Sequence, residues 1–294
     1  MLTTLLSAIP QPPVNDVMPK TAETIFNIFI FIPLGIALVI AIRKLAKGHG
    51  PLLLFCLIGG ALAAGLEPVV DVLGLVYLKE NGALGTFTVL GRTMPLYICF
   101  VYPWYVGGLG YLAYKMFQRG VTMKNLFALW ALDFVVDIFL ESPGILAHTY
   151  LYYGHQPFNF WGFPLWWGFV NPVMPMLAGA LIYHLWPRFD TPWKKLGIIA
   201  CIPMADGMVN GGIAFPMTWA LNQTDVSYVW TYLASFVTLG LALFTVWIIG
   251  LTVVRPADEV VPENLLQKLK AVAFPGSAPT PSPVPEPAPV NTNA

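Results

Sequence analysis

Long apolar stretches recur along this chain, and each is about as long as the hydrocarbon core of a lipid bilayer requires. A helix needs roughly 20 mostly apolar residues to cross that core. Turn residues and nearly all of the lysines and arginines lie between the stretches. Charged residues make up only 10% of the sequence, against about a quarter in soluble domains. The bilayer is therefore the expected solvent for most of the chain.

Backbone N–H and C=O groups inside a bilayer find no water to bind, so each apolar span is expected to be helical. The pattern predicts an all-α fold, a polytopic membrane helix bundle with about seven transmembrane helices. The predicted spans are 24–43, 51–74, 95–117, 123–141, 164–186, 195–216 and 229–253.

Lysines and arginines fall unevenly on the two sides of this predicted bundle. One side holds only Lys20, Lys79 and Arg92, and the other side holds most of the rest. By the positive-inside rule, the more basic side is cytoplasmic. The N-terminus is then outside and the C-terminus inside, which requires an odd number of crossings. The more basic set is Arg43, Lys44, Lys47, Lys115, Arg119, Lys124, Arg188, Lys194, Lys195 and Arg255.

The sequence divides into four regions. Leucines recur at helical spacing after the last span, with Lys268 and Lys270 opposite them, as in a helix that lies on the cytoplasmic leaflet. The Pro-rich residues beyond it cannot bury enough apolar surface to fold. The regions are an extracytoplasmic segment (1–23), the transmembrane domain (24–255), a short cytoplasmic amphipathic helix (256–274) and a disordered tail (275–294).

Six acidic residues occur within the predicted spans, where each costs roughly 2.5–3.5 kcal/mol to insert. Residues four apart on a helix share one face, so the acids of one span form one stripe. The six are Glu67 and Asp71 in the second span, Asp133, Asp137 and Glu141 in the fourth, and Asp206 in the sixth.

The direction of each span gives the depth of these acids. The second, fourth and sixth spans run outward and the third and fifth run inward, so acids and aromatic side chains share the outer half of the bilayer. We expect a cavity that opens to the outer face; in the alternative, the acids pair with amides, tyrosines or Arg92 and only hold the helices together. The residues expected to bind a substrate there are Tyr102, Trp104, Tyr105, Trp166, Trp167, Asn171, Asn210 and His155.

Carboxyl groups one turn apart in an apolar setting repel each other as anions and are poorly solvated. One or more are therefore expected to hold a proton at neutral pH. A protonated carboxyl is a general acid, and its ionised neighbour is the matching base. Nearby aromatic faces stabilise a cationic intermediate, as they bind cations. We assign the donor to the stripe of Asp133, Asp137 and Glu141, with the other three acids as base or ion-stabilising partners.

No cofactor, metal or nucleic acid is expected. The three cysteines lie inside apolar runs without the close spacing of a thiolate metal site. Formal net charge is zero, which gives no sign of a nucleic-acid partner. The expected partners are the bilayer and a lipophilic small molecule, and the oligomeric state stays open. The outer loop 142–163 holds histidines and tyrosines that suit either a lid or an interfacial aromatic belt.

Four sequence blocks resemble those of the AveC-like spirocyclase family, a group of actinobacterial integral membrane proteins. The resemblance covers most of the chain up to about residue 255. It implies a bacterial plasma-membrane cyclase or dehydratase of secondary metabolism that acts on a lipophilic polyketide, with spiroketal formation as the reaction. The blocks are GLEPVVD (65–71), LDFVVDIFLESPG (132–144), YYGHQPFNFWGFPLWWGFVNP (152–172) and ADGMVNGG (205–212).

Two other functions fit the same residues. An integral-membrane terpene cyclase, which starts by protonating an alkene or epoxide, needs the same acid and the same aromatic lining. A proton-coupled transporter or lipid-binding protein uses buried acids to relay protons, although the chain shows no internal repeat of the kind common in transporters. Turnover of a bound lipid separates an enzyme from a transporter.

Overall fold

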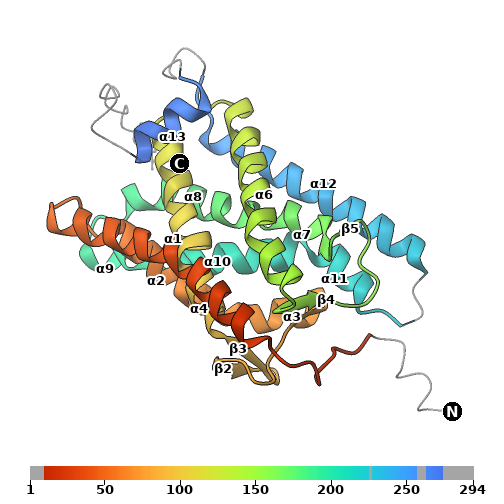
Figure 1. The fold of residues 1–294 in the computed structure, drawn as a ribbon. Coiled ribbons are helices and arrows are strands. Elements are labelled where there is room, and N and C mark those ends of the chain that lie inside the picture. Colours follow the sequence, from red (N-terminus) through yellow and green to blue (C-terminus); the bar gives the residue numbers. More distant parts are fainter. Residues whose placement is uncertain (1–9, 225–226, 257–262, 274–294) are drawn as a thin grey trace.

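Helices make up most of the computed structural model, which describes residues 10–224, 227–256 and 263–273 (Figure 1). Among these described residues, six helical spans are long and apolar enough to cross a membrane. Several are built from two helices in series. The spans are α1 (Lys20–Ala46), α2 with α3 (Leu52–Ala63, Glu67–Gly74), α4 with α5 (Leu96–Tyr102, Leu109–Gln118), α7 with α8 (Leu165–Val170, Val173–Leu185), α9 with α10 (Pro192–Lys195, Gly197–Met208) and α12 (Tyr228–Val253).

A seventh helix, α6 (Met123–Leu146), corresponds to the fourth predicted span. It has 24 residues, enough to cross the hydrocarbon core at 1.5 Å per residue. Asp133, Asp137 and Glu141 make it too polar to count among the six apolar spans. The predicted all-α membrane bundle is confirmed, with α6 as its acidic member.

One end of the bundle, which we call the basic end, joins the α5–α6 connection to α13 (Leu265–Ala273). Arg119 in that connection donates two hydrogen bonds of 2.8 Å to the Glu263 carboxylate. The next residues extend this contact, because the Lys268 ammonium donates to the Gly120 carbonyl at 2.8 Å and Val121 bridges to Val254. The C-terminal end of α12 and the start of α6 therefore meet here.

The opposite end, the sheet end, carries three small antiparallel sheets that the sequence did not predict. Residues near the described N-terminus also lie there, since Val17 bridges to Asn81 and Asp16 pairs with Lys79 at 3.3 Å. The described N-terminal and C-terminal residues thus occupy opposite ends, as an odd number of crossings requires. The sheets are β1 (Val76–Leu78) with β4 (Tyr150–Tyr152), β2 (Gly85–Val89) with β3 (Arg92–Pro95), and β5 (Asn159–Phe160) with β6 (Phe163–Pro164).

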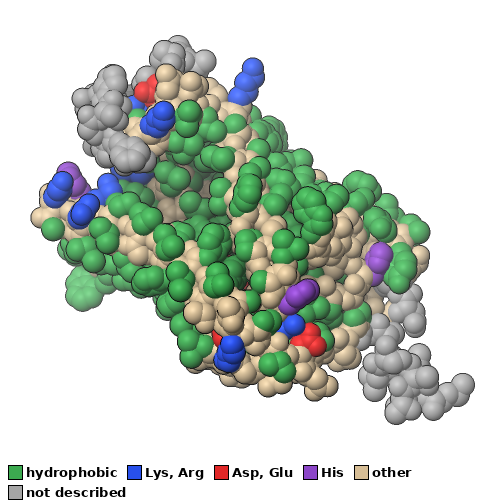
Figure 2. All heavy atoms as spheres, in the orientation of Figure 1, with side chains coloured by type: hydrophobic (Ala, Val, Ile, Leu, Met, Phe, Trp, Pro, Cys, Tyr) green, Lys and Arg blue, Asp and Glu red, His purple; other side chains and the backbone are tan. Residues whose placement is uncertain are grey.

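Apolar side chains cover the outside of the bundle between these ends. Figure 2 shows hydrophobic atoms across the middle of the visible face and lysines and arginines mainly at its two extremities. On α1, Ile25 and Ile28 are about 60% exposed, at 63% and 59%, and α12 exposes Trp230 in the same way. A water-soluble protein rarely presents so extended an apolar surface, so this face suits lipid.

Two π-helical segments interrupt the spans, Pro103–Gly108 between α4 and α5 and Val209–Ile213 after α10. The predicted span 195–216 is therefore irregular, and α11 (Phe215–Leu221) continues it. Tight packing fixes the first π segment against α2, because a side chain at Gly107 would collide with the Cys56 carbonyl. Such segments often occur at functional sites.

The helix predicted to lie on the cytoplasmic leaflet differs from expectation in one respect. α13 does form, but it packs against α5 and α6, and Lys268 is completely buried rather than facing water. The ammonium instead binds the Gly120 carbonyl, an orphan acceptor after the end of α5. The predicted disordered tail, 275–294, lies outside the described residues.

Candidate active site

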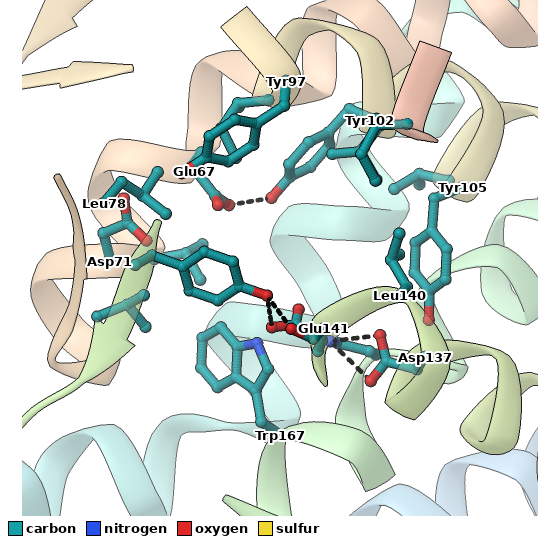
Figure 3. A pocket seen from close by; sticks show the side chains of 18 of the residues that line it. Glu67, Asp71, Leu78, Tyr97, Tyr102, Tyr105, Asp137, Leu140, Glu141 and Trp167 are labelled. Carbon is teal, nitrogen blue, oxygen red and sulfur yellow. Dashed lines mark hydrogen bonds between the residues drawn. The ribbon is translucent and has the colours of Figure 1, made fainter. Parts of the chain in front are cut away.

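Four of the six predicted acids line one cavity near the sheet end (Figure 3). They are Glu67 and Asp71 from α3, and Asp137 and Glu141 from α6. The space between the lining atoms, including its open part, is about 730 Å³. We call this space the carboxyl cavity.

α3 presents its two acids because of how the helix begins and ends. A 3₁₀ turn and Pro68 in the first helical turn start the helix, where a missing proline N–H costs nothing. Glu67 sits in that first turn, so the helix dipole favours its anion. Leu75 then adopts a left-handed conformation, φ 55°, which ends α3 and turns the chain into β1.

The first π-helical segment supplies two phenols to the cavity. The Tyr102 hydroxyl, just before the segment, donates a hydrogen bond to the Glu67 carboxylate. Tyr105 lies within the segment, and Figure 3 shows its hydroxyl pointing toward Asp137. Residues three positions apart on a helix lie on one face, and both Tyr102 and Tyr105 line the cavity.

The break between α7 and α8 places an amide beside α6. Asn171 precedes Pro172, where the helix is interrupted, and its side chain donates to both Asp137 oxygens at 3.1 Å. The Asp137 side chain is 1% exposed. Asn171 therefore fixes the orientation of a buried carboxyl.

The sheet formed by β1 and β4 closes the cavity on its outer side. Side chains alternate along strands, and Leu78, Tyr150 and Tyr152 line the cavity, whereas Tyr77 and Tyr153 line a separate pocket beyond the sheet. Predicted loop 142–163 thus contributes a covering element.

Both inward tyrosines of β4 hold Glu141. The Tyr150 hydroxyl donates to Glu141 Oε2 at 2.7 Å and the Tyr152 hydroxyl donates to the same oxygen at 3.0 Å. Burial, and then the nearby Glu141 carboxyl, raise the pKa of both phenols well above the ordinary value. The two phenols therefore act as donors to Glu141.

No lysine, arginine or histidine lines the cavity within the described part of the chain. Arg92 lies beyond the β1–β4 sheet, where its guanidinium stacks over Tyr77, 5.1 Å from the ring centre, and donates to the Tyr153 hydroxyl at 3.3 Å. Among the described residues, none of the four cavity carboxyls forms a salt bridge. The salt bridge between Arg92 and these acids, one of the alternatives considered for them, is therefore absent among the described residues.

Asp206 lies behind the cavity wall. It is fully buried, and Asn210, which does line the cavity, donates to its carboxyl at 3.0 Å. The other Asp206 oxygen and the Asn210 carbonyl oxygen have no hydrogen-bond partner among the described residues. Asn210 therefore offers an acceptor at the wall, and its hydrogen bond to Asp206 holds the amide in place.

Asp133 lies on the same helix as Asp137 and Glu141 but outside the lining of the carboxyl cavity. Each step of four residues rotates a helix position by about 40°, so the stripe drifts, and Asp133 lines a different, largely apolar pocket with Leu129 and Leu269. The three acids predicted to form one stripe are therefore divided between two pockets.

Three predicted substrate-binding aromatics also lie outside the cavity. Trp166 is fully buried and donates to the Gln156 side chain at 3.0 Å. Trp104 is outside the lining and packs edge-on against Tyr105. His155 stacks on Tyr228 with ring centres 3.7 Å apart, and burial lowers its pKa. The predicted binding residues Tyr102, Tyr105, Trp167, Asn171 and Asn210 do line the cavity.

Some lining residues were not foreseen. Phe26 and Ile30 of α1 close one side, and nothing in an apolar first span distinguishes them. The sequence does contain a signal for Tyr150 and Tyr152, because two tyrosines that are two residues apart would lie on the same face of a strand. Within the described residues, no group of three or more His, Cys, Asp or Glu side chains has the arrangement of a metal site.

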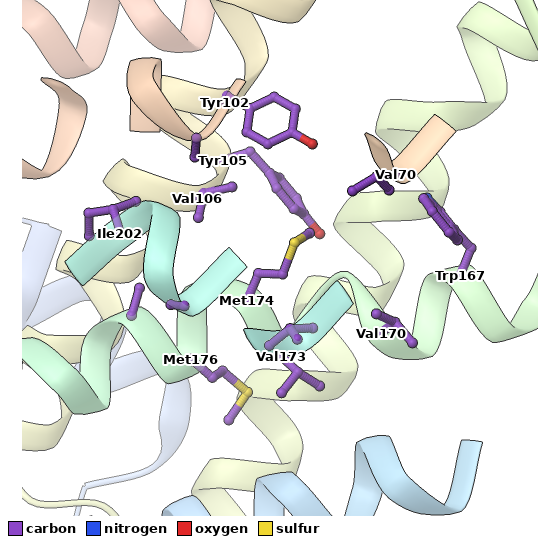
Figure 4. Close-up of a cluster of buried hydrophobic side chains, with 14 of the residues drawn as sticks. Val70, Tyr102, Tyr105, Val106, Trp167, Val170, Val173, Met174, Met176 and Ile202 are labelled. Atoms are coloured by element: carbon purple, nitrogen blue, oxygen red, sulfur yellow. The ribbon is translucent and has the colours of Figure 1, made fainter. Parts of the chain in front are cut away.

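An apolar wall surrounds the acids. Figure 4 shows part of the apolar cluster, where Met174 lies beside Tyr105 and Val70 lies near Trp167. The chain is thus an integral, multi-pass membrane protein of all-α fold with a buried acid cluster. Comparisons with protein-family models, curated proteins and solved structures found no match.

Proposed function

We propose that this protein is a membrane-embedded cyclase or dehydratase that uses carboxyl acid–base catalysis on a lipophilic substrate. One observation carries the proposal: four carboxyls from two helices line an apolar, covered cavity without a basic residue in its described lining. Four anions cannot share so poorly solvated a space without large repulsion. At least one therefore holds a proton, and a proton donor next to a carboxylate is the pair that general acid–base catalysis needs.

The hydrogen bonds favour particular roles within this set. Glu141 accepts from two phenols and Asp137 from an amide, and donors of this kind stabilise an anion. Asp71 has no hydrogen bond to its carboxyl among the described residues and is 2% exposed. We assign the acid to Asp71 and the base to Glu141, which reverses the roles suggested by spacing alone.

A dihydroxyketone gives the clearest reaction for such a pair. One hydroxyl adds to the ketone carbon to form a hemiketal, without loss of atoms. Asp71 then protonates the hemiketal hydroxyl. The C–O bond breaks, water departs, and an oxocarbenium ion forms. The second hydroxyl attacks that carbon and passes its proton to Glu141. The products are a spiroketal and one water, and proton return from Glu141 to Asp71 restores the site.

Aromatic rings support the cationic step. Trp167 and Tyr105 lie at the cavity wall, and a ring face stabilises a nearby positive charge by about 0.5–2 kcal/mol. The resemblance to the AveC-like spirocyclase family, which we propose as the family of this chain, points to spiroketal formation on a polyketide in a bacterial plasma membrane. The membrane-embedded cavity agrees with a lipophilic substrate.

The test uses purified protein in nanodiscs with a long-chain dihydroxyketone. Mass spectrometry follows the loss of one water, and chirality of the product separates enzymatic closure from spontaneous closure. Asp71→Asn and Glu141→Gln should abolish turnover. Asp133→Asn is the matched control on α6, because Asp133 lies outside the cavity, and should retain it. Full activity in both cavity variants would overturn the proposal.

Terpenoid cyclisation by protonation of an alkene is the second candidate, since it needs the same acid beside the same aromatic wall. A polyene of equal length in the same assay gives a product of unchanged mass with fewer double bonds. Asp71→Asn should abolish this reaction too, whereas Glu141→Gln should alter mainly the final deprotonation. A protein that binds both probes and converts neither would be a lipid-binding or transport protein.

A further inference from the structure

A second cavity adjoins the carboxyl cavity on the lipid-facing side of the bundle. Its walls are Leu66, Val69 and Leu73 of the α2–α3 span and, opposite them, Gly207 and Gly211 with neighbouring residues after α10. We call it the glycine groove. The space between its lining atoms is about 530 Å³. Both walls belong to spans that are apolar enough to cross the membrane, so the groove lies at membrane depth.

The groove leads to the acids. Val70, Trp167 and Asn210 line both the glycine groove and the carboxyl cavity. Among the described residues, no charged side chain lines the groove, and Leu73 and Val69 are 42% and 38% exposed. An alkyl chain in the bilayer therefore meets an apolar path that ends at the carboxyl cavity.

The glycines of the groove differ from those that bring helices together. A side chain at Gly60 would collide with the backbone of Pro103, and one at Gly59 with the carbonyl of Ile199. Within the described part of the chain, an added Cβ at Gly211 meets nothing within 4 Å, and one at Gly207 meets only Leu66, at 3.6 Å. Packing within the chain does not require glycine at these two positions, so their open space is available to a ligand.

Asn210 marks the junction of the two spaces with a polar acceptor. Its amide nitrogen is bound to Asp206 at 3.0 Å, while its carbonyl oxygen is buried without a partner among the described residues. A buried acceptor without a hydrogen-bond partner is destabilising. A hydroxyl on an entering chain would satisfy it and would orient the chain toward the acids.

We propose that the glycine groove is the binding site and lateral entrance for an alkyl chain that reaches the carboxyl cavity from the bilayer. This inference rests on the proposed function only for what happens to the alkyl chain after it reaches the acids. Binding of the alkyl chain in the groove does not depend on turnover. The ligand class is a long-chain lipophile with a hydroxyl group near its reacting carbons.

A photoreactive fatty acid with a chain diazirine, in nanodiscs of phosphatidylcholine, tests binding. Peptide mapping should find the label on 65–74 and 207–218. Gly211→Phe places a ring in the groove from a position where an added Cβ has room, and it should lower labelling of both peptides several-fold. Gly212→Phe is the matched control: its position is also open but lies outside the groove lining, so labelling should persist. Thermal unfolding of both variants checks that the fold is intact.

Three outcomes would overturn the proposal that the glycine groove is the entrance. Equal labelling in Gly211→Phe and the unmodified chain would show that the groove is not used. Label confined to α1 and α6 would place the entrance beside Phe26 instead. Disulfide-linked dimers of Gly211→Cys would show that a second copy occupies the groove. Glu141→Gln should keep the labelling while losing turnover, so failure of the entrance and failure of the catalytic proposal are distinguishable.

Discussion

The two ends of the bundle differ in the partners of their buried charged groups. At the basic end, Arg119 meets Glu263 in a two-bond pair and Lys268 binds a carbonyl. In the carboxyl cavity near the sheet end, acids such as Glu141 meet phenols and amides but no cation within the described chain. An ion pair stabilises the docking of a helix. A cluster of acids without a cation inside a membrane instead costs free energy, and such clusters are typical of functional sites.

The largest effect expected from this contrast is on turnover. Glu141→Gln keeps the size and hydrogen-bonding shape of the side chain but removes the base, so turnover of the dihydroxyketone should fall by about 10²–10⁴-fold. Glu263→Gln removes an acid of the basic end and should leave turnover unchanged. Mass spectrometry of the product measures both. Equal losses would mean that the two acids do not differ as their contacts indicate.

Close packing at the sheet end gives the next effect. A side chain at Gly144 would collide with the Tyr150 ring and lie 2.9 Å from Phe26. Gly144→Ala should therefore destabilise the protein by about 1–3 kcal/mol and displace Tyr150 from Glu141. Thermal unfolding in detergent measures the loss. Gly65→Ala is the control, because nothing lies within 4 Å of that position, and a similar loss there would rule out the steric cause.

The phenols of β4 should have a smaller effect. Tyr150→Phe and Tyr152→Phe each remove one donor to Glu141, and a hydrogen bond to a charged group contributes about 1.5–3 kcal/mol. We expect a fall in turnover of about tenfold or more for each, with little change in substrate affinity. Tyr153→Phe, on the other face of the sheet, should be neutral. Unchanged rates in the β4 variants would show that Glu141 does not act as an anion.

Sequence alone predicted the parts of this molecule that local periodicity controls. Apolar length located the spans, and i,i+4 spacing paired Glu67 with Asp71 and Asp137 with Glu141 correctly. The same rule groups Asp133 with these acids, but a face defined over two turns drifts by about 80°, and Asp133 lines a different pocket. Local spacing therefore identifies neighbours on one helix but not the wall of a cavity over longer distances.

Contacts between segments far apart in the sequence could not be predicted from local sequence patterns. The pairing of β1 with β4 joins residues more than seventy positions apart, and short strands in outer loops carry little signal. Lys268 shows the same limit: a lysine opposite a leucine stripe normally faces water, yet here it is buried by docking of α13. Tertiary contacts, rather than local pattern, decide such cases.

The smallest expected effect concerns the pair at the basic end. The hydrogen bonds from Arg119 lower the pKa of Glu263, so the pair stabilises α13 above the ordinary glutamate pKa of about 4.3 and loses that contribution as pH falls through the lowered value. Solvent near the pair limits it to about 0.5–1 kcal/mol. Hydrogen exchange of α13 measures the change.

Protection of α13 should therefore fall as the pH is taken below about 4, and Glu263→Gln should show weaker protection near neutral pH with little further loss on acidification. The Lys268 contact to Gly120 remains in both proteins, so α13 loosens rather than detaches. A wild-type profile that does not change with pH, matched by the Glu263→Gln profile, would mean that the buried lysine and apolar contacts alone hold the helix. The two ends would then differ in their partners but not in how much stability charge pairing contributes.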